Sequence, residues 1–308
     1  MKLKRISEQV IVITGATSGI GLATARDAVK RGARVVLSAR NEEDLAQIVA
    51  ELGTERAAWV GADVSDPRAL ALVRDTAIAR FGGFDTWINN AGLSLYGNLA
   101  SIDLIEARRL FDVNFWGVVN GTSAALSHLR ERGGAIVNVG SALDARDVPC
   151  EGMFTASKAA VHAYTESIRE ECEREGLPVS ISLVRPANVD TPFMEHARNH
   201  LTGQPAVRGP VYSPALVAEV ILHCAEHGKR NVKVGRTGRK IEPTIEQPMR
   251  DEDALFLPPL VEGKTHGLYD GKVRGKSLST WLSLHPLAAF GTAVGAAFLV
   301  SGVALARR

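Results

Sequence analysis

The sequence predicts an α/β fold in which helices cover both faces of a parallel sheet. Seven short runs rich in β-branched residues alternate with stretches that are long enough to form helices. The early runs are apolar almost throughout, and strands of that kind are buried on both faces of a sheet. We therefore predict a doubly wound sheet with strands at Val10–Thr14, Arg34–Ser38, Ala57–Ala62, Thr86–Asn89, Ala135–Val139, Val179–Val184 and Asn231–Val234.

Length and charge limit what the chain can be. Its 308 residues suffice for one domain and a tail, which we place at residues 1–240 for the domain, 241–280 for an extension or linker and 281–308 for a C-terminal segment. The formal net charge is +2, and the 36 Lys and Arg residues are spread along the chain, which argues against a nucleic-acid partner. Three cysteines without a CxxC pair indicate reduced thiols in a cytoplasmic domain.

The C-terminal segment differs in composition from the rest of the chain. Pro286–Ala306 contains 21 residues and no charge, and two arginines follow it. A helix of that length can cross the apolar core of a bilayer, which is about 30 Å thick. We therefore expect a transmembrane helix, with the basic residues between 272 and 276 holding the main domain on the cytoplasmic side. A buried C-terminal helix of the globular domain is the alternative.

A glycine-rich turn follows the first predicted strand. It reads TGATSGIG from Thr14 to Gly21 and leads into a predicted helix that ends near Arg31. Residues without a Cβ let the backbone approach a pyrophosphate, whose charge then faces the N-terminus of the helix. Between a buried strand and a helix, such a turn is typical of a Rossmann-type dinucleotide site. We expect cofactor contacts from Gly15, Thr17, Ser18, Gly19, Ile20 and Gly21.

The ends of the next two strands bear on which dinucleotide binds. An acidic residue after the second strand would bind the ribose 2′-hydroxyl and repel a 2′-phosphate, but this chain has Ser38, Ala39 and Arg40 there. A guanidinium can bind a phosphate through two parallel hydrogen bonds, so Arg40 favours NADP(H) over NAD(H). Asp63 and Val64 close the third strand, where the carboxylate could accept a hydrogen bond from the adenine amino group.

In combination, these motifs resemble those of the short-chain dehydrogenase/reductase superfamily. The TGxxxGIG turn, the Asp63–Val64 pair and the NNAG run at Asn89–Gly92 occur in the family's order and spacing, and the resemblance covers roughly residues 8–235. The chain looks most like membrane-associated bacterial members. The resemblance implies a Rossmann-type domain that transfers a hydride between a nicotinamide and a carbonyl or alcohol group.

The resemblance also implies roles for single residues. Asn114 would anchor a water that connects to the lysine of the site, Ser141 would hydrogen-bond the substrate oxygen, and Lys158 would bind the nicotinamide ribose. No His, Cys and Asp residues have the spacing of metal ligands, so we expect no metal site. Further cofactor contacts are implied for Asn90, Ala91, Gly92, Val189 and Thr191.

Phe154 occupies the position of the family's catalytic tyrosine. Family members carry YxxxK on a helix, whereas this chain reads FTASK from Phe154 to Lys158. The phenol would donate a proton to the substrate carbonyl, and loss of a positioned acid typically costs about 10²- to 10⁴-fold in rate. Two hypotheses follow. The protein is an NADP(H)-dependent oxidoreductase that circumvents the loss, or it is an NADP(H)-binding pseudoenzyme or scaffold at a membrane that has lost turnover.

Few nearby groups could replace the phenol. Thr155 and Ser157 point away from the Phe154 side chain around the helix. Asp144 and Asp147 lie on the loop after Ser141, and a carboxylic acid with a raised pKa could donate a proton there. A water held by the serine and the lysine of the site could also protonate an alkoxide slowly.

The substrate can be described only by class. By resemblance, the segment after Thr191 corresponds to the family's substrate lid, where Phe193, Met194 and Leu201 could line an apolar pocket or equally pack a pair of helices. Together with a membrane anchor, this favours a lipophilic carbonyl or alcohol. In this family, the two long helices around Asn114 and Lys158 often pair with their copies, so the resemblance favours a homodimer.

The C-terminal segment generates the first testable prediction. We predict that the full-length protein sediments with the membranes of a cell lysate and is released by detergent, because the uncharged segment is long enough to span the bilayer. The measurement is fractionation followed by immunoblotting. Recovery of the whole protein in the soluble fraction without detergent would show that the segment is not a membrane span.

Overall fold

A parallel seven-stranded sheet forms the centre of the molecule. The computed structural model describes residues 2–144, 148–203, 205–206, 209–237, 242–243, 253–259 and 263–285. The strand order is β11-β7-β6-β4-β1-β2-β3, and every pairing in this sheet is parallel. The seven strands are β1 (Val10–Thr14), β2 (Arg34–Ala39), β3 (Ala57–Gly61), β4 (Thr86–Asn89), β6 (Gly134–Val139), β7 (Val179–Pro186) and β11 (Asn231–Val234). All seven predicted strands are confirmed, with ends that shift by at most two residues.

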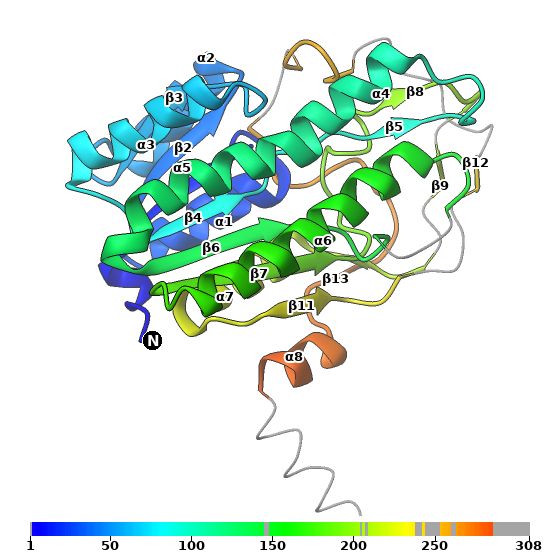
Figure 1. The fold of residues 1–308 in the computed structure, drawn as a ribbon. Helices are drawn as coiled ribbons and strands as arrows, with labels where there is room; N and C mark the ends of the chain where they lie inside the picture. The colour runs from blue at the N-terminus through cyan, green and yellow to red at the C-terminus, as the bar shows by residue number, and fades with distance from the viewer. Residues whose placement is uncertain are drawn as a thin grey trace, which may run out of the picture.

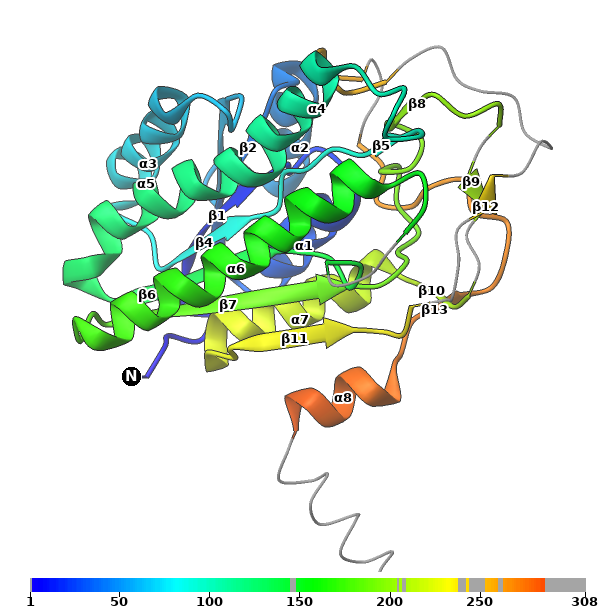
Figure 2. The same cartoon turned by 45° about the vertical axis from the view of Figure 1, so that its right-hand side comes forward.

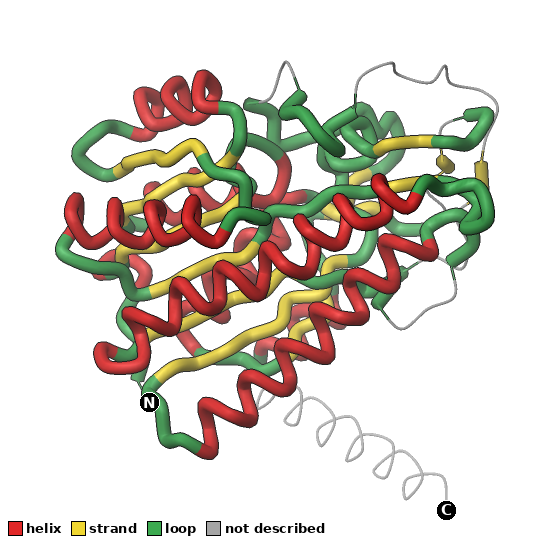
Figure 3. The backbone as a smooth tube through the Cα atoms, turned by 45° about the horizontal axis from the view of Figure 1, so that its top comes forward, coloured by secondary structure: helices red, strands yellow, loops and turns green. Residues whose placement is uncertain are grey.

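Helices cover both faces of this sheet, which confirms the doubly wound class (Figure 1). In Figure 1, α3, α5 and α6 lie in front of the strands, with α1 and α7 behind them. Figure 3 shows the same layering from a second direction. The helices are α1 (Gly19–Lys30), α2 (Glu42–Leu52), α3 (Pro67–Phe81), α4 (Leu104–Phe111), α5 (Gly117–Arg132), α6 (Gly152–Arg174), α7 (Pro214–His227) and α8 (Leu278–Leu284).

The apolar strands divide their side chains between two hydrophobic cores. Along β1, Ile11 and Ile13 belong to the core under α1, α2 and α7, whereas Val10 and Val12 belong to the core under α3 and α5. All four side chains are at most 3% exposed. Successive side chains of a strand point to opposite faces, so a strand without polar residues needs helices on both sides.

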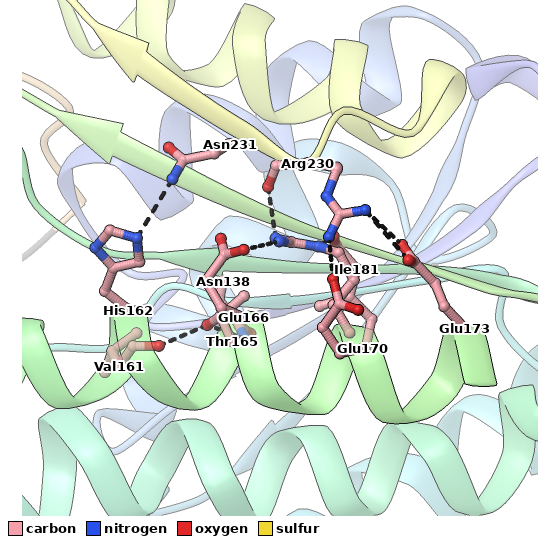
Figure 4. Close-up of polar contacts among 11 residues, drawn as sticks. Asn138, Val161, His162, Thr165, Glu166, Glu170, Glu173, Ile181, Arg230 and Asn231 are labelled. Atoms are coloured by element: carbon pink, nitrogen blue, oxygen red, sulfur yellow. Dashed lines mark hydrogen bonds and ion pairs between the residues drawn. The ribbon is translucent and has the colours of Figure 1, made fainter. Parts of the chain in front are cut away.

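Polar contacts fix α6 to the sheet (Figure 4). The buried Arg169 donates from Nε to the carbonyl of Ile181 on β7, at 2.7 Å, and from Nη2 to the carbonyl of Arg230, at 2.6 Å. Thr165 accepts a hydrogen bond from Nδ2 of Asn138 on β6, at 3.0 Å. A buried guanidinium is tolerated only where its donors are satisfied, so these contacts define the position of the helix against β6 and β7.

Short strand pairs lie beside the sheet near the carboxyl ends of its strands. β5 (Leu95–Tyr96) pairs with β8 (Arg198–Asn199), and β10 (Val211–Tyr212) pairs with β13 (Val273–Arg274). A third pair joins β9 (Pro205–Ala206) to β12 (Glu242–Pro243). Figure 2 shows β13 beside β10, with α8 below β11.

The chain after residue 240 contacts the Rossmann-type domain. From about Glu242 to Lys276 the sequence indicates no defined element, whereas β12 and β13 occur there, and α8 crosses the expected boundary at residue 280. The domain boundaries themselves stay predictions. Residues 286–308, which carry the expected transmembrane helix, lie outside the described residues. Within the part of the chain that is described, no helix is both long and apolar enough to cross a membrane.

The contact between α5 and β4 leaves no room for a side chain at Gly121. A Cβ there would lie 2.0 Å from Oδ1 of Asn89 and 2.9 Å from Nε1 of Trp87. We predict that Gly121→Ala lowers the free energy of unfolding by about 1–3 kcal/mol, because the buried Asn89 must move out of its hydrogen bonds. The measurement is urea denaturation. Ser123→Ala, at an exposed position of the same helix, is the control and should change stability by less than about 0.5 kcal/mol.

Candidate active site

A cavity of about 720 Å³ opens at the carboxyl ends of the sheet strands, next to the boundary between β1 and β4. The strand order changes direction at this boundary, which is where doubly wound proteins bind their ligands. Gly21 and Asn114 do not line the cavity but support residues that do. The sequence-predicted residues that line it are Gly15, Thr17, Ser18, Gly19, Ile20, Arg40, Asp63, Val64, Asn90, Ala91, Gly92, Ser141, Phe154, Lys158, Val189 and Thr191.

The glycine-rich turn is packed against the end of β4. Gly15 has a φ of +63°, and a Cβ on it would lie 2.7 Å from Cα of Ala91. A Cβ on Gly21 would lie 2.1 Å from the carbonyl oxygen of Gly15. Nδ2 of Asn90 donates to the carbonyl oxygens of Thr14 and Gly15, at 3.1 and 3.0 Å. These contacts therefore fix the turn before any ligand binds. Because its glycines have no Cβ atoms, the turn leaves space in which a pyrophosphate can approach the backbone.

The two side chains predicted to select the adenosine half make contacts within the protein. Arg40 donates to the carbonyl oxygens of Ala254 and Phe256, at 2.6 and 3.2 Å. Asp63 accepts hydrogen bonds from Ser65 and from Nη2 of Arg109, the latter at 2.5 Å. Burial would raise the pKa of the Asp63 carboxyl, but the hydrogen bonds from Arg109 and Ser65 outweigh it and hold that pKa below its ordinary value. Their roles toward a cofactor stay predictions.

Residues of the C-terminal extension form one wall of the cavity. The N–H of Gly19 donates to the carbonyl of Lys264, and the N–H of Gly263 donates to the carbonyl of Thr17, both at 2.9 Å. Nδ1 of His266 lies 2.8 Å from a carboxylate oxygen of Asp190. Pro258, Pro259, Leu268, Tyr269 and Asp270 also line the cavity. This wall could not be predicted from the sequence, because the composition of a Pro-, Gly- and charge-rich segment does not determine where the segment lies.

Lys158 and Asn114 meet beneath Gly92. A Cβ placed on Gly92 would lie 3.4 Å from both Oδ1 of Asn114 and Nζ of Lys158. Asn114 sits in a short π-helix (Asp112–Trp116), and its side chain exchanges hydrogen bonds with the backbone of Leu93, at 2.7 and 3.0 Å. Such π-helical turns often mark functional sites. The structure thus brings together the two residues that the resemblance connects through a water.

Burial controls the charge of the lysine. The Lys158 side chain donates to the carbonyl of Val139, at 3.2 Å, and only 5% of the residue is exposed. Desolvation lowers the pKa of its amine to about 8. Oγ of Ser141 accepts a hydrogen bond from the N–H of Leu143, at 3.1 Å, and lines the same cavity.

Phe154, at the position where the resemblance implies a tyrosine, lines the cavity near Lys158. The residue is 7% exposed, its ring centre lies 5.8 Å from that of Phe193, and Nζ of Lys158 lies 5.9 Å from the ring centre of Phe154. Phe154, Phe193 and Met194 line the cavity, which decides for Phe193 and Met194 between the two roles that the sequence left open, whereas Leu201 does not line it. The position keeps its apolar contacts but has no proton to give.

Asp144 is held in ion pairs rather than aimed at a substrate. Its side chain is fully buried and forms ion pairs with Arg185 and with Nδ1 of His162. Asp144 does not line the cavity, so its carboxyl group is not placed to donate a proton to a substrate there. Asp147, the second carboxyl that the sequence offered, lies outside the described residues.

Two ionisable residues of the cavity were missed from the sequence. Tyr96 and Glu151 line it beside Phe154, and both are at most 3% exposed. Burial raises the pKa of the Glu151 carboxyl to about 7. The available signal was a glutamate one helical turn before Phe154, at the start of the predicted helix. An acidic residue at a helix start is so common that it draws no notice.

Comparisons with known proteins agree with this geometry. A model of the short chain dehydrogenase family matches residues 9–202. An uncharacterized oxidoreductase of Bacillus subtilis, YxnA, is 47% identical over 78% of this chain and 69% of its own. A short chain dehydrogenase/reductase from Burkholderia phymatum, solved in complex with NAD, has a TM-score of 0.68 and 27% identity over 76% of this chain and 90% of its own. An alcohol dehydrogenase from Thermococcus sibiricus, complexed with 5-hydroxy-NADP, has a TM-score of 0.64 and 25% identity over 79% and 99%.

Proposed function

The chain belongs to the short-chain dehydrogenases, a family of oxidoreductases, and from that premise we propose that it transfers a hydride between NADP(H) and a carbonyl or alcohol substrate. The observation that carries the proposal is the single cavity that joins the glycine-rich turn to Ser141 and Lys158. A nucleotide whose pyrophosphate rests on the turn can extend along this cavity to both side chains. Because the glycine-rich turn, Ser141 and Lys158 line the same cavity, the site is best suited to a nucleotide-dependent reaction at Ser141.

The bound nicotinamide would supply or accept the hydride, and the protein's own groups would do the rest. The Ser141 hydroxyl would donate a hydrogen bond to the substrate oxygen and hold it in place. The Lys158 amine would hold the ribose hydroxyls, and it is protonated below a pKa of about 8. Phe154 and Phe193 would exclude water from the reacting atoms, which strengthens each polar contact inside the cavity.

The preference for NADP(H) rests on Arg40. This guanidinium lines the cavity at the end of β2, where the chain has no acidic side chain to repel a 2′-phosphate. Arg40 also donates hydrogen bonds to two carbonyl oxygens of the extension, which fix the position of its guanidinium. A 2′-phosphate would bind to this guanidinium in addition to the two carbonyl groups. Among the similar structures, one is complexed with a modified NADP and another with NAD, so the neighbours do not decide the preference.

A nucleotide-binding protein without turnover is the second candidate. Phe154 favours it, because a buried phenylalanine replaces the group that would protonate the substrate. Such a protein would hold NADP(H) and signal its presence to a partner. Turnover alone separates the two candidates, because both use the same cradle.

The substrate class and the cellular setting extend the proposal. The apolar side chains of Phe154, Phe193 and Met194 would suit a lipophilic carbonyl or alcohol. Membrane attachment through residues 286–306 would bring such a substrate close to the cavity. Attachment and homodimerisation through α5 and α6 both stay predictions.

Replacement of Arg40 tests the choice of cofactor. We predict that the wild-type full-length chain binds NADPH more tightly than NADH, and that Arg40→Ala reduces this preference by about 10- to 100-fold, because a charge-assisted contact to the 2′-phosphate is lost. The measurement is fluorescence titration of both variants with both nucleotides. Equal losses of NADPH and NADH affinity would instead limit Arg40 to holding the extension.

Restoration of the phenol tests turnover. We predict that the wild type oxidises NADPH in the presence of a panel of lipophilic carbonyls, and that Phe154→Tyr does so faster, because it adds a positioned acid next to Lys158. The measurement is the loss of NADPH absorbance. If only Phe154→Tyr turns over, the protein is a nucleotide-binding protein; if neither does, the oxidoreductase proposal fails.

A further inference from the structure

The cavity contains two buried ionisable side chains, Tyr96 and Glu151, which line it together with Phe154. Tyr96 forms the end of β5, and Glu151 directly precedes α6, one helical turn before Phe154. Only 3% of Tyr96 and 2% of Glu151 is exposed. Ser94, Tyr96 and Glu151 line the cavity together with Ser141, and burial and the neighbouring Glu151 raise the pKa of Tyr96. Two buried polar groups thus face the space in which a substrate oxygen would lie.

The backbone around Glu151 is built to keep it there. The N–H of Gly97 donates to the carbonyl of Cys150, at 2.9 Å, which joins the end of β5 to the start of α6. The Glu151 carbonyl accepts the first hydrogen bond of the helix from Thr155, also at 2.9 Å. Cys150 has a φ of +64° and is the one non-glycine residue with a positive φ in the described ranges. A positive φ at a non-glycine residue costs conformational free energy, so it persists only where the surrounding structure enforces it. Such positions cluster at functional sites.

Within the described residues, no ion pair or helix-capping hydrogen bond accounts for the burial of the Glu151 carboxyl group. It forms no hydrogen bond to the N-terminus of α6, although it occupies the N-cap position. Other charged side chains of α6, such as Arg169 and Glu166, form ion pairs with each other, but they lie farther along the helix than Glu151. A buried carboxyl costs folding free energy unless it is paired or neutral, so its retention in the cavity points to a chemical use.

The electrostatics suit a proton donor. Burial raises the pKa of Glu151 to about 7, even though the positive end of a helix dipole would act in the opposite direction. Burial and the neighbouring Glu151 hold the pKa of Tyr96 well above its ordinary value, so the phenol keeps its proton and can donate to the carboxylate. A general acid is most effective when its pKa lies near the working pH.

We infer that Glu151 supplies the proton that the absent phenol at position 154 would have supplied, and that Tyr96 positions its carboxyl group. The inference rests on the proposed oxidoreductase function. In the direction of reduction, the carbonyl carbon accepts the hydride, and the carbonyl oxygen takes the proton from Glu151 and becomes a hydroxyl. The carboxylate left behind takes a new proton from solvent. In the direction of oxidation, the carboxylate removes the hydroxyl proton as the hydride leaves the carbon.

The pH dependence of the full-length enzyme tests this assignment. At saturating NADPH, the rate of carbonyl reduction by the wild type should fall as the pH rises through about 7, because the acid form of Glu151 is lost. Glu151→Gln should lower kcat by about 10²- to 10⁴-fold and remove this step from the profile, with NADPH affinity unchanged. Besides Glu151, the ionisable side chains that line the described part of the cavity are those of Arg40, Asp63, Tyr96, Lys158, Asp190, Glu195, His196, Tyr269 and Asp270. Of these, Tyr96 shifts the pKa of Glu151. Saturation with NADPH removes the contribution of Lys158 to the pH profile, because the ionisation of Lys158 affects nucleotide binding.

Two further variants distinguish a chemical role from a structural one. Tyr96→Phe retains Glu151 but removes a hydrogen bond that lowers the carboxyl pKa, so the midpoint of the pH profile should move upward. Glu171→Gln makes the same chemical change at an exposed position of α6 and should match the wild type. Infrared difference spectra of the protein without nucleotide should contain a protonated-carboxyl band that titrates near pH 7, and this band should be missing from Glu151→Gln.

The outcomes separate failure of the inference from failure of the proposed function. A Glu151→Gln variant that binds NADPH and keeps the wild-type rate and pH profile overturns the inference and leaves the oxidoreductase function standing. An inactive wild type beside an active Phe154→Tyr overturns it as well, since Glu151 then gives no proton to a carbonyl. If Glu151→Gln does not fold, two other results overturn the inference. One is a pH profile of Tyr96→Phe with the same midpoint as the wild type, and the other is the lack of a titrating protonated-carboxyl band in the infrared spectrum of the wild type. Failure of both wild type and Phe154→Tyr to turn over removes the proposed function itself.

Discussion

The close approach of the glycine-rich turn to the end of β4 is the constraint on which the rest of the site depends. Gly15 lies against the backbone of Ala91, and Gly21 lies against the carbonyl of Gly15, so neither position has room for a side chain. Asn90 then joins the two strands through its amide group. Because the turn can neither widen nor shift, α1 begins where its N-terminus faces the cavity. The other groups of the site are arranged around that fixed point.

The sheet could be predicted from the sequence because its physical signal is local. Strands such as β1 and β4 are short and apolar, and their length and burial follow from the residues themselves. The glycine-rich turn is likewise encoded locally, because only residues without a Cβ allow the close approach. Asn114 and Lys158 are far apart in the chain, and the family resemblance, rather than any local pattern, predicted that they would meet.

The missed parts of the site depend on contacts that no local pattern encodes. Glu151 resembles any acidic residue at a helix start, and only its burial against Tyr96 sets it apart. From its place after Ser141, Asp144 was predicted as a candidate proton donor, but its ion pair with Arg185 gives it a structural role. Arg40 was predicted to meet a phosphate, but the extension that it also holds could not be placed from its composition. In each case a partner distant in sequence decides what an ionisable group can do.

The extension has a consequence for how specificity can diverge among related chains. The part of the chain that matches the family model ends at residue 202, whereas the far wall of the cavity includes residues between 254 and 270. Two chains could therefore agree at every residue of the matched region and still enclose differently shaped cavities. The matched region contains the glycine-rich cradle, and residues of the extension form a further part of the cavity wall. Substitutions in this wall can reshape the space for a substrate without a change in the sheet, because the wall follows the last strand of the sheet in the chain.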